Sequence, residues 1–324
     1  MTARRASTIV ALCAFAALAA PALAQPTKKK PPPAPPAAAK SDTGNLDLAY
    51  GAFQRGYYLT ALAEASKRAQ QNDNAAMTLL GEIYAQGLGV GRDDSKAAQW
   101  YKLAAARGGR DAMFALAMFN LEGRDGPRNP DEAARLLAAA AKLGHAPAAY
   151  DLGLLYLQGQ QFPQDFVRAA ELFRQAADAG NMEAQYALAT MIMEGRGVPK
   201  DVNEATRLMG LASVAGNVDA VVEYAIAEFN GKGIEKDEAA AAKRFLIAAR
   251  RGSAIAQDRL ARILMAGRGV PADATEAVKW HLIAKAGGAS DPELDVFAGK
   301  QTPQVRDAAE KAANKWLSTA APRS

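Results

Sequence analysis

The chain has 324 residues, of which 50% are hydrophobic and only 7% aromatic, and alanine supplies much of the apolar share, which favours close-packed helices over a β-sandwich. The formal net charge is +5, but residues 1–40 hold six of the 39 basic residues and no acidic one, which leaves 33 basic against 34 acidic residues beyond them. That balance gives no compositional support for a nucleic-acid-binding face, so we expect no nucleic-acid partner.

The first 24 residues have the pattern of a secretory signal peptide. Arg4 and Arg5 form a positive n-region, residues 6–20 are uncharged and mostly apolar, and residues 22–24 (Ala-Leu-Ala) form a cleavage site. An uncleaved membrane anchor is the alternative, although an alanine-rich stretch this short would be a weak one. We therefore expect cleavage near Ala24, a periplasmic location with secretion as the other destination, and no stable membrane span after cleavage.

Residues 25–44 form a Pro/Lys-rich flexible linker. Its prolines, at 26, 31–33, 35 and 36, forbid regular helix or strand and favour polyproline II. A semi-rigid spacer is one interpretation, and a docking peptide or a cationic tether to anionic envelope surfaces is the other.

From Ala76 onward the chain repeats itself every 36 residues, six times, without insertion or deletion. Self-similarity at a fixed period is the signature of repeat architectures. With the start of each unit as position 1, glycine occupies positions 12 and 33 and alanine positions 22 and 29 in all six units. The units begin at Ala76, Ala112, Ala148, Ala184, Ala220 and Ala256.

Each unit is predicted to be a helix–loop–helix hairpin. Helix A covers about positions 1–11 and ends at the glycine of position 12, because glycine accepts the positive φ of a helix C-cap. Position 18 is Asp in five units and Asn129 in the remaining one, as expected for the N-cap of helix B. Helix B runs to about position 32, before the glycine at 33. Capping-box spacing occurs in three pairs: Asn129/Glu132, Asp201/Glu204 and Asp273/Glu276.

Small residues indicate how the two helices meet. Position 6 is Gly or Ala in every unit, and the alanines at positions 22 and 29 lie seven residues apart, on one face of helix B. Small side chains on both helices allow their backbones to approach closely.

The predicted solenoid covers residues 45–291, with regular units over 76–291, and residues 292–324 form capping helices and a tail. Before the regular units, residues 46–70 have the pattern of a degenerate leading helix pair that turns at residues 55–56 (Arg-Gly).

Two helices are predicted after the last unit. Residues 291–292 (Asp-Pro) and 302–303 (Thr-Pro) each combine an N-cap with proline at the first helical position. The last helix has a charged face, as the end of a solenoid requires, and an opposite apolar stripe made of Val305, Ala308, Ala309, Ala312, Trp316 and Leu317.

Unit one follows the pattern A-x-x-x-L-G-x-x-Y-x-x-G-x-G-V-x-x-D-x-x-K-A-x-x-W-Y-x-x-A-A-x-x-G through Ala76, Leu80, Gly81, Tyr84, Gly87, Gly89, Val90, Asp93, Lys96, Ala97, Trp100, Tyr101, Ala104, Ala105 and Gly108. This pattern resembles the Sel-1-like repeat, a relative of the tetratricopeptide repeat. Departures are Asp125 and Gln161 at the second loop glycine and Glu228 at the tyrosine. Over residues 76–291 the resemblance implies an all-α fold, a right-handed α-solenoid, and a role as an adaptor in complexes, often in bacterial envelope processes or signalling.

No catalytic or metal-binding constellation stands out. Cys13, the only cysteine, leaves with the signal, so the mature chain has no thiol nucleophile and no disulfide. His145 and His281 fit the repeat register as surface or structural residues, with a catalytic or metal role as the alternative. Helix capping explains the acids of position 18, and residues 87–91 follow a helix and lack the ending of a phosphate loop. We expect no enzyme, metal or cofactor.

Helix A carries two apolar stripes. Positions 1, 5 and 8 face helix B and the neighbouring unit, while positions 3, 7 and 10 form a second stripe in units two to five. A groove for a partner helix or extended peptide is one interpretation, and core buried by superhelical packing is the other. The candidate groove residues are Phe114, Met118, Leu121, Tyr150, Leu154, Leu157, Tyr186, Met193, Val222, Ile226 and Phe229.

Export, repeat architecture and the lack of a catalytic constellation favour a periplasmic protein–protein interaction scaffold. It would bind partners in the cell envelope through a concave helical groove and regulate an envelope or signalling complex. One alternative is a cell-wall or carbohydrate-binding module, whose sugar-stacking residues would be Tyr57, Tyr58, Tyr150 and Tyr186. A hydrolase is the other alternative.

Overall fold

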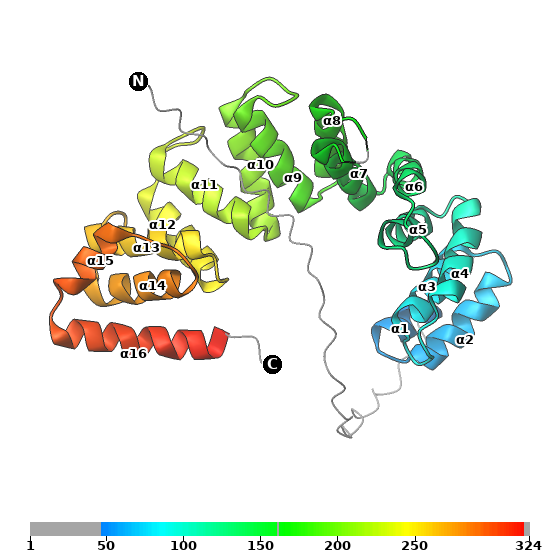
Figure 1. Cartoon of the computed structure of the whole chain (residues 1–324), viewed down its shortest axis with the longest axis horizontal. Helices are drawn as coiled ribbons and strands as arrows, with labels where there is room; N and C mark the ends of the chain where they lie inside the picture. The colour runs from blue at the N-terminus through cyan, green and yellow to red at the C-terminus, as the bar shows by residue number, and fades with distance from the viewer. Residues whose placement is uncertain (1–46, 161, 321–324) are drawn as a thin grey trace, which may run out of the picture. The chain divides into compact units, whose positions relative to one another are not determined.

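The computed structural model describes residues 47–160 and 162–320, which form sixteen helices and no strand. The predicted signal peptide (1–24) and linker (25–44) lie outside these residues. The helices follow in chain order (Figure 1): α1 (Leu48–Gln54), α2 (Tyr58–Ala69), α3 (Asn74–Gln86), α4 (Asp94–Ala106), α5 (Arg110–Glu122), α6 (Pro130–Lys142), α7 (Ala146–Gln158), α8 (Phe166–Asp178), α9 (Met182–Glu194), α10 (Val202–Ala215), α11 (Val218–Asn230), α12 (Glu238–Arg250), α13 (Ala254–Ala266), α14 (Ala274–Ala286), α15 (Pro292–Gly299) and α16 (Pro303–Ala320). Odd-numbered helices from α3 to α13 are helix A of the six units, and α4 to α14 are helix B.

The predicted N-cap of helix B is confirmed in all six units. In unit one, Asp93 Oδ1 accepts a hydrogen bond from the backbone N–H of Lys96 at 2.9 Å. The N–H of Asp93 itself donates to the carbonyl of Tyr84, on helix A, at 2.9 Å. Position 18 therefore satisfies a free donor of helix B and also fixes the loop between the two helices.

The capping boxes predicted for α6, α10 and α14 do not form. The N-cap N–H already donates to a carbonyl of helix A, so it is not available to the glutamate three residues later. Each glutamate instead pairs with a cation one turn further on: Glu132 with Arg135 at 2.6 Å, Glu204 with Arg207 at 2.7 Å and Glu276 with Lys279 at 3.0 Å.

Helix A begins two residues before the predicted start, as in α3, which begins at Asn74 rather than Ala76. Its N-cap is the residue that follows the glycine of position 33. Asn181, Asn217 and Ser253 cap α9, α11 and α13 with side-chain oxygens. Gly109 has no side chain to offer, and His145 caps α7 with a ring nitrogen. This mixture of residue types gave no common signal in the sequence.

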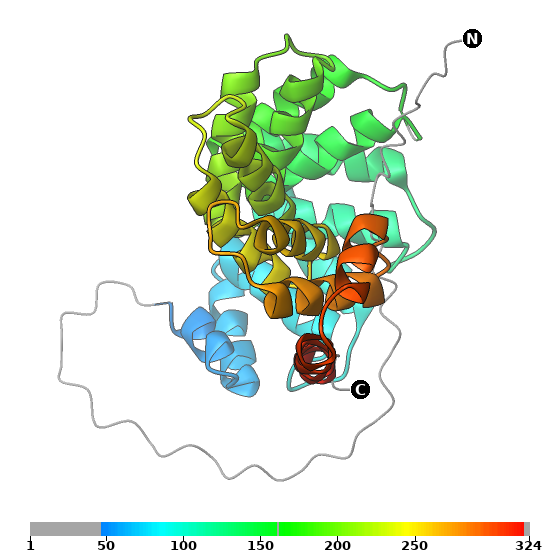
Figure 2. The same ribbon diagram turned by 90° about the vertical axis from the view of Figure 1, so that its left-hand side faces the viewer.

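Helices pack mainly against their neighbours in the chain, so each helix A lies between helix B of its own unit and helix B of the unit before. The two views of the structure show the same succession of hairpins (Figures 1 and 2). All twelve alanines at positions 22 and 29 are 0% exposed. The close approach of the helices predicted from these alanines is therefore confirmed.

In units one and three, a glycine at position 6 packs against an aromatic ring at position 26 of the same hairpin. A Cβ atom on Gly81 would lie 2.4 Å from Tyr101 Cε1, and one on Gly153 would lie 2.7 Å from Phe173 Cε1. Glycine at position 6 thus leaves room for an aromatic ring at position 26. The four units with alanine at position 6 carry various residues at position 26: Leu137, Met209, Phe245 and His281.

The second loop glycine, at position 14, contacts the preceding unit. Gly197 has a φ of +69°, and a Cβ atom there would lie 2.3 Å from the carbonyl oxygen of Phe166, at the start of α8. Only glycine fits this approach and this backbone conformation.

The ends of the stack use the same packing. At the start, α1 and α2 form a hairpin that turns at Gly56. At the other end α16 packs on α14 (Figure 2), where helix A of a further unit would lie. Within the predicted stripe of α16, Ala309 is buried and Ala308 exposed, while Ala313 is buried beside it. Among the described residues, no helix has the length and apolar character needed to cross a membrane.

Candidate functional site

The eleven candidate groove residues lie on α5, α7, α9 and α11. Ten of them are half-buried, and most of these pack against the hydrophobic core with one side of the side chain. The exception is Val222, which is 3% exposed and belongs to the core. The stripe is therefore partly accessible rather than fully open or fully closed, and its role in binding stays a prediction.

Neighbouring side chains hold the aromatic members of the stripe in place. The Phe114 ring stacks on His145 with centroids 4.6 Å apart, and the Tyr150 ring lies 5.6 Å from that of Phe173. The guanidinium of Arg268 lies 4.1 Å from the centroid of the Phe229 ring. These contacts restrict the conformations that the rings can adopt.

A row of carboxylates runs beside the stripe on α7, α9 and α11: Asp151, Glu183, Asp219 and Glu223. Their helical spacing places them on the same side of helix A as positions 3 and 7. None of the four forms an ion pair or side-chain hydrogen bond with another described residue. On helix B, by contrast, Glu132, Glu204 and Glu276 are all paired with cations of their own helix.

The titration of this row reflects its environment. Burial raises the pKa of Asp151 to about 6. Burial also raises the pKa of Glu223, and the nearby charge of Asp219 adds to the effect. Burial, together with the charges of Glu223 and Asp219, raises the pKa of the Tyr186 hydroxyl to about 12. The helix-A face of α7 to α11 is thus partly desolvated and negatively charged.

The two histidines have structural roles. His145 Nδ1 accepts a hydrogen bond from the backbone N–H of Ala148 at 3.1 Å and so caps α7. His281 is 2% exposed, and its Nε2 lies 2.8 Å from Asp295 Oδ1 on α15. They lie on different units, and no group of three or more His, Cys, Asp or Glu side chains in the described part of the chain is arranged to hold a metal ion.

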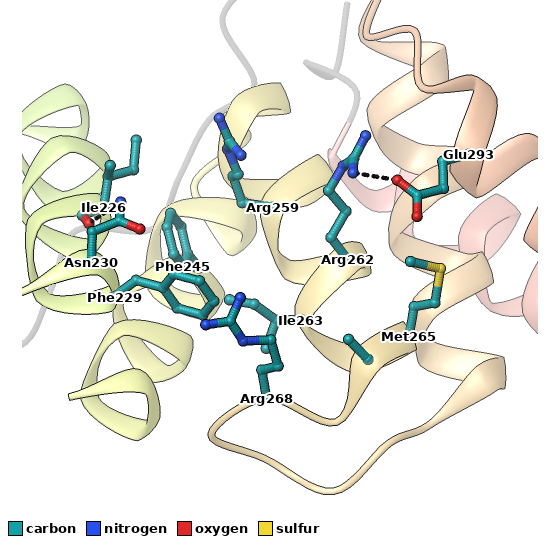
Figure 3. A pocket seen from close by; sticks show the side chains of 11 residues that line it. Ile226, Phe229, Asn230, Phe245, Arg259, Arg262, Ile263, Met265, Arg268 and Glu293 are labelled. Carbon is teal, nitrogen blue, oxygen red and sulfur yellow. Dashed lines mark hydrogen bonds and ion pairs between the residues drawn. The ribbon is translucent and has the colours of Figure 1, made fainter. Parts of the chain in front are cut away.

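A cavity of about 350 Å³ opens between α11 and α13 at the C-terminal end of the face (Figure 3). Two candidate groove residues, Ile226 and Phe229, line it together with Ile263 and Met265. Its size is at the lower end of the range of small-ligand sites. The C-terminal end of the groove predicted from the sequence therefore forms part of the wall of this cavity.

Three arginines also line the cavity, and they differ in their partners. Arg262 Nε lies 2.5 Å from Asp291 Oδ2, and its Nη1 lies 2.7 Å from Glu293 Oε2. Arg268 pairs with Glu238. Arg259 forms no ion pair or hydrogen bond with any other described residue, and its side chain is exposed.

Sequence reasoning missed this cavity. One feature of the sequence could have pointed to it. Positions 4 and 7 of helix A carry no basic residue in units one to five, but they are Arg259 and Arg262 in unit six. The cavity itself could not be predicted, because it depends on the spacing between α11 and α13.

These observations define a class: an α-solenoid of short helical hairpins whose helix-A face is partly accessible. The Sel1 repeat model matches six segments, residues 74–109, 110–145, 146–181, 183–217, 219–253 and 254–288. Since these matches cover well over half of the chain, the protein belongs to the Sel1 repeat family. The matched segments begin within a residue of the start of each helix A.

Solved structures show the same fold. The chain is 26% identical to a Sel1 repeat protein from Oxalobacter formigenes, with a TM-score of 0.62 over 75% of this chain and 97% of the other. It is 25% identical to c5321, a protective antigen present in uropathogenic Escherichia coli strains displaying an SLR fold, with a TM-score of 0.54 over 82% of this chain and 65% of that one. No curated protein matches the chain in sequence. Proteins built from Sel1 repeats are generally protein–protein interaction scaffolds.

Proposed function

We propose that this protein is a periplasmic scaffold that binds protein partners through the helix-A face and has no catalytic activity of its own. The observation that carries the proposal is the half-buried apolar stripe of α5 to α11 with unpaired carboxylates beside it. A surface that combines accessible apolar area with unneutralised charge is suited to a complementary partner. The family's general role and the signal-like residues 1–24 support the proposal.

Site-specific crosslinking in living cells tests the binding face. A photo-crosslinking residue at Leu154, on α7, is expected to capture an envelope protein. The matched control is the same probe at Val167, which is 57% exposed on α8, on the helix-B surface. Capture from Val167 with none from Leu154 would move the binding surface to helix B and refute the helix-A face.

The location has its own test. Cells that produce the full chain are separated into cytoplasmic and periplasmic fractions, and the N-terminus of the protein is sequenced. We expect a periplasmic protein that begins at Gln25. A cytoplasmic protein with an intact N-terminus would contradict the periplasmic location and leave the binding face as a separate question.

The absence of catalysis is tested with hydrolase substrates, and we expect no turnover. His145→Asn is the informative variant, because Asn preserves the N-cap of α7 while it removes the imidazole. A robust activity that this variant loses would show that the protein is an enzyme.

A further inference from the structure

The cavity between α11 and α13 has features of a recognition site for one kind of peptide group. We infer that it binds a carboxylate that lies beside a bulky apolar side chain in a partner polypeptide, and that Arg259 holds that carboxylate. The inference rests on the proposed scaffold function, because it takes the ligand to be part of a protein.

The apolar half of the site comes from two neighbouring units. Phe229 on α11 and Ile263 on α13 form opposite walls, and the buried Phe245 of α12 lies between them (Figure 3). The cavity of about 350 Å³ can receive one large side chain. Arg268 rests on the Phe229 ring and is held there by Glu238, so this wall is fixed in advance.

The polar half of the site is the guanidinium of Arg259, which makes no direct ion pair with a described residue. Arg259 and Arg262 extend from α13 in the same direction at the rim (Figure 3). Arg262 is already paired with Asp258, Asp291 and Glu293. The Arg259 guanidinium forms no hydrogen bond or ion pair with another described residue, although the charges of Glu223 and Asp258 are close enough to interact with it. A guanidinium offers a planar fork of donors that matches a carboxylate, so an anion of this type is the complementary ligand.

Glu293 shows how a carboxylate contacts this rim. It belongs to the short helix α15, its side chain is 65% exposed, and it reaches Arg262 at 2.7 Å. Glu293 takes up the arginine next to Arg259, and its negative charge repels an incoming carboxylate at this rim. Removal of the Glu293 charge should therefore strengthen binding.

The rest of the helix-A face gives the site its selectivity. At position 4, α7 has Asp151 and α11 has Glu223, where α13 has Arg259. A carboxylate in the partner is repelled along α7 to α11 and is accepted at α13. A segment that lies along this face would therefore place its acidic group over α13.

The test measures fluorescence anisotropy with the full chain and a labelled peptide, acetyl-Ser-Gly-Trp-Glu-Gly-Ser-amide. We expect it to bind and its Gln counterpart not to bind. Arg259→Ala should weaken binding about tenfold or more, since a charge-assisted contact is lost, and Glu293→Gln should strengthen it about threefold. Arg174→Ala is the matched control, because Arg174 is an exposed arginine of α8 with no ion pair among the described residues.

A second peptide pair separates two sources of the carboxylate. One peptide ends in Trp with a free terminal carboxylate, and the other is its amide. Binding of the free acid alone, again weakened by Arg259→Ala, would assign the group to a chain terminus, while binding of the internal Glu peptide assigns it to a side chain. Either result supports the inference.

Equal binding to wild type and Arg259→Ala, or no binding of either carboxylate peptide up to about 1 mM, overturns the inference. Arg259→Gln keeps the aliphatic stem and repeats the measurement if the alanine variant has a lower melting temperature. The crosslinking experiment at Leu154 tests partner binding by the helix-A face independently of the cavity. A crosslink at Leu154 without peptide binding would therefore overturn the inference about the cavity and leave the proposed scaffold function intact.

Discussion

The two sides of helix A differ in how fully their side chains are buried and paired within the protein. On the side of α7 that faces helix B, Leu152 is 4% exposed and Gly153 lies against the ring of Phe173. On the other side, Tyr150 and Leu154 are half-buried, and the Asp151 carboxylate has no partner among the described residues. The first side is closed by the protein's own side chains, and the second is left partly open.

The difference indicates that the two sides serve different purposes. Close packing at the A–B interface stabilises each hairpin through apolar burial. A partly buried carboxylate without a cation disfavours folding, so its presence is explained better by a contact outside the chain. Mutations on the two sides should therefore have unequal effects on stability.

The largest expected effect is on the closed side. Phe173→Ala should reduce the free energy of unfolding by about 3–5 kcal/mol, because it leaves a cavity where a 0% exposed ring was. Leu154→Ala, on the open side, should cost about 1 kcal/mol, since only part of that side chain leaves water. Urea denaturation followed by circular dichroism measures both. Equal losses would show that the two sides are packed alike.

The close contact between positions 6 and 26 of unit three gives the next effect. Gly153→Ala should destabilise by about 1–3 kcal/mol, because the added methyl group overlaps the Phe173 ring. Adding Phe173→Leu reproduces the Ala–Leu pair that unit two has at Ala117 and Leu137. In a double-mutant cycle the two changes should compensate by about 1 kcal/mol. Simple additivity would mean that these positions are not coupled.

The N-cap that joins the two helices should have a smaller effect. Asp201→Ala removes the hydrogen bond from the Glu204 N–H, which is 3.0 Å long, and should cost about 1 kcal/mol. Asp201→Asn is the control, since asparagine also caps helices. A denaturation midpoint that falls equally in both variants would assign the effect to the charge rather than to the cap.

The smallest effect is on the open side and depends on pH. Burial raises the pKa of Asp151 in the folded protein to about 6, above the usual value of 3.8 for an aspartate. Ionisation of this carboxyl therefore lowers stability as the pH rises from about 4 to 6. Asp151→Asn should therefore be more stable than wild type by about 1 kcal/mol at pH 7 and no more stable at pH 4. Melting temperatures across this range check the difference. A constant gap would indicate that the ionisation of Asp151 is not its cause.

Much of the fold was predictable because its determinants are local. The glycine that ends helix A, the aspartate that caps helix B and the alanines at the interface each act within a few residues of the chain. The failed capping boxes were not predictable, since the N–H of Asp201 is taken by the carbonyl of Ile192 on the other helix. The helix start at His145 was missed because a histidine cap has no strong sequence signal.

The candidate site was predictable only in part, for the same physical reason. Helical spacing placed Ile226 and Phe229 on one stripe, and both line the cavity. Spacing also placed Val222 there, but packing buries it. Arg259 was not identified, because its importance comes from the cavity that two successive units form together.

Because helices pack mainly against their neighbours in the chain, the packing pattern also affects how the chain can fold. Each hairpin closes over a short stretch of sequence and then docks on the one before it, so no step waits for residues at the far end. Folding can nucleate at any hairpin and propagate along the chain in both directions. A chain that arrives N-terminus first can thus fold progressively, with α16 closing the stack last.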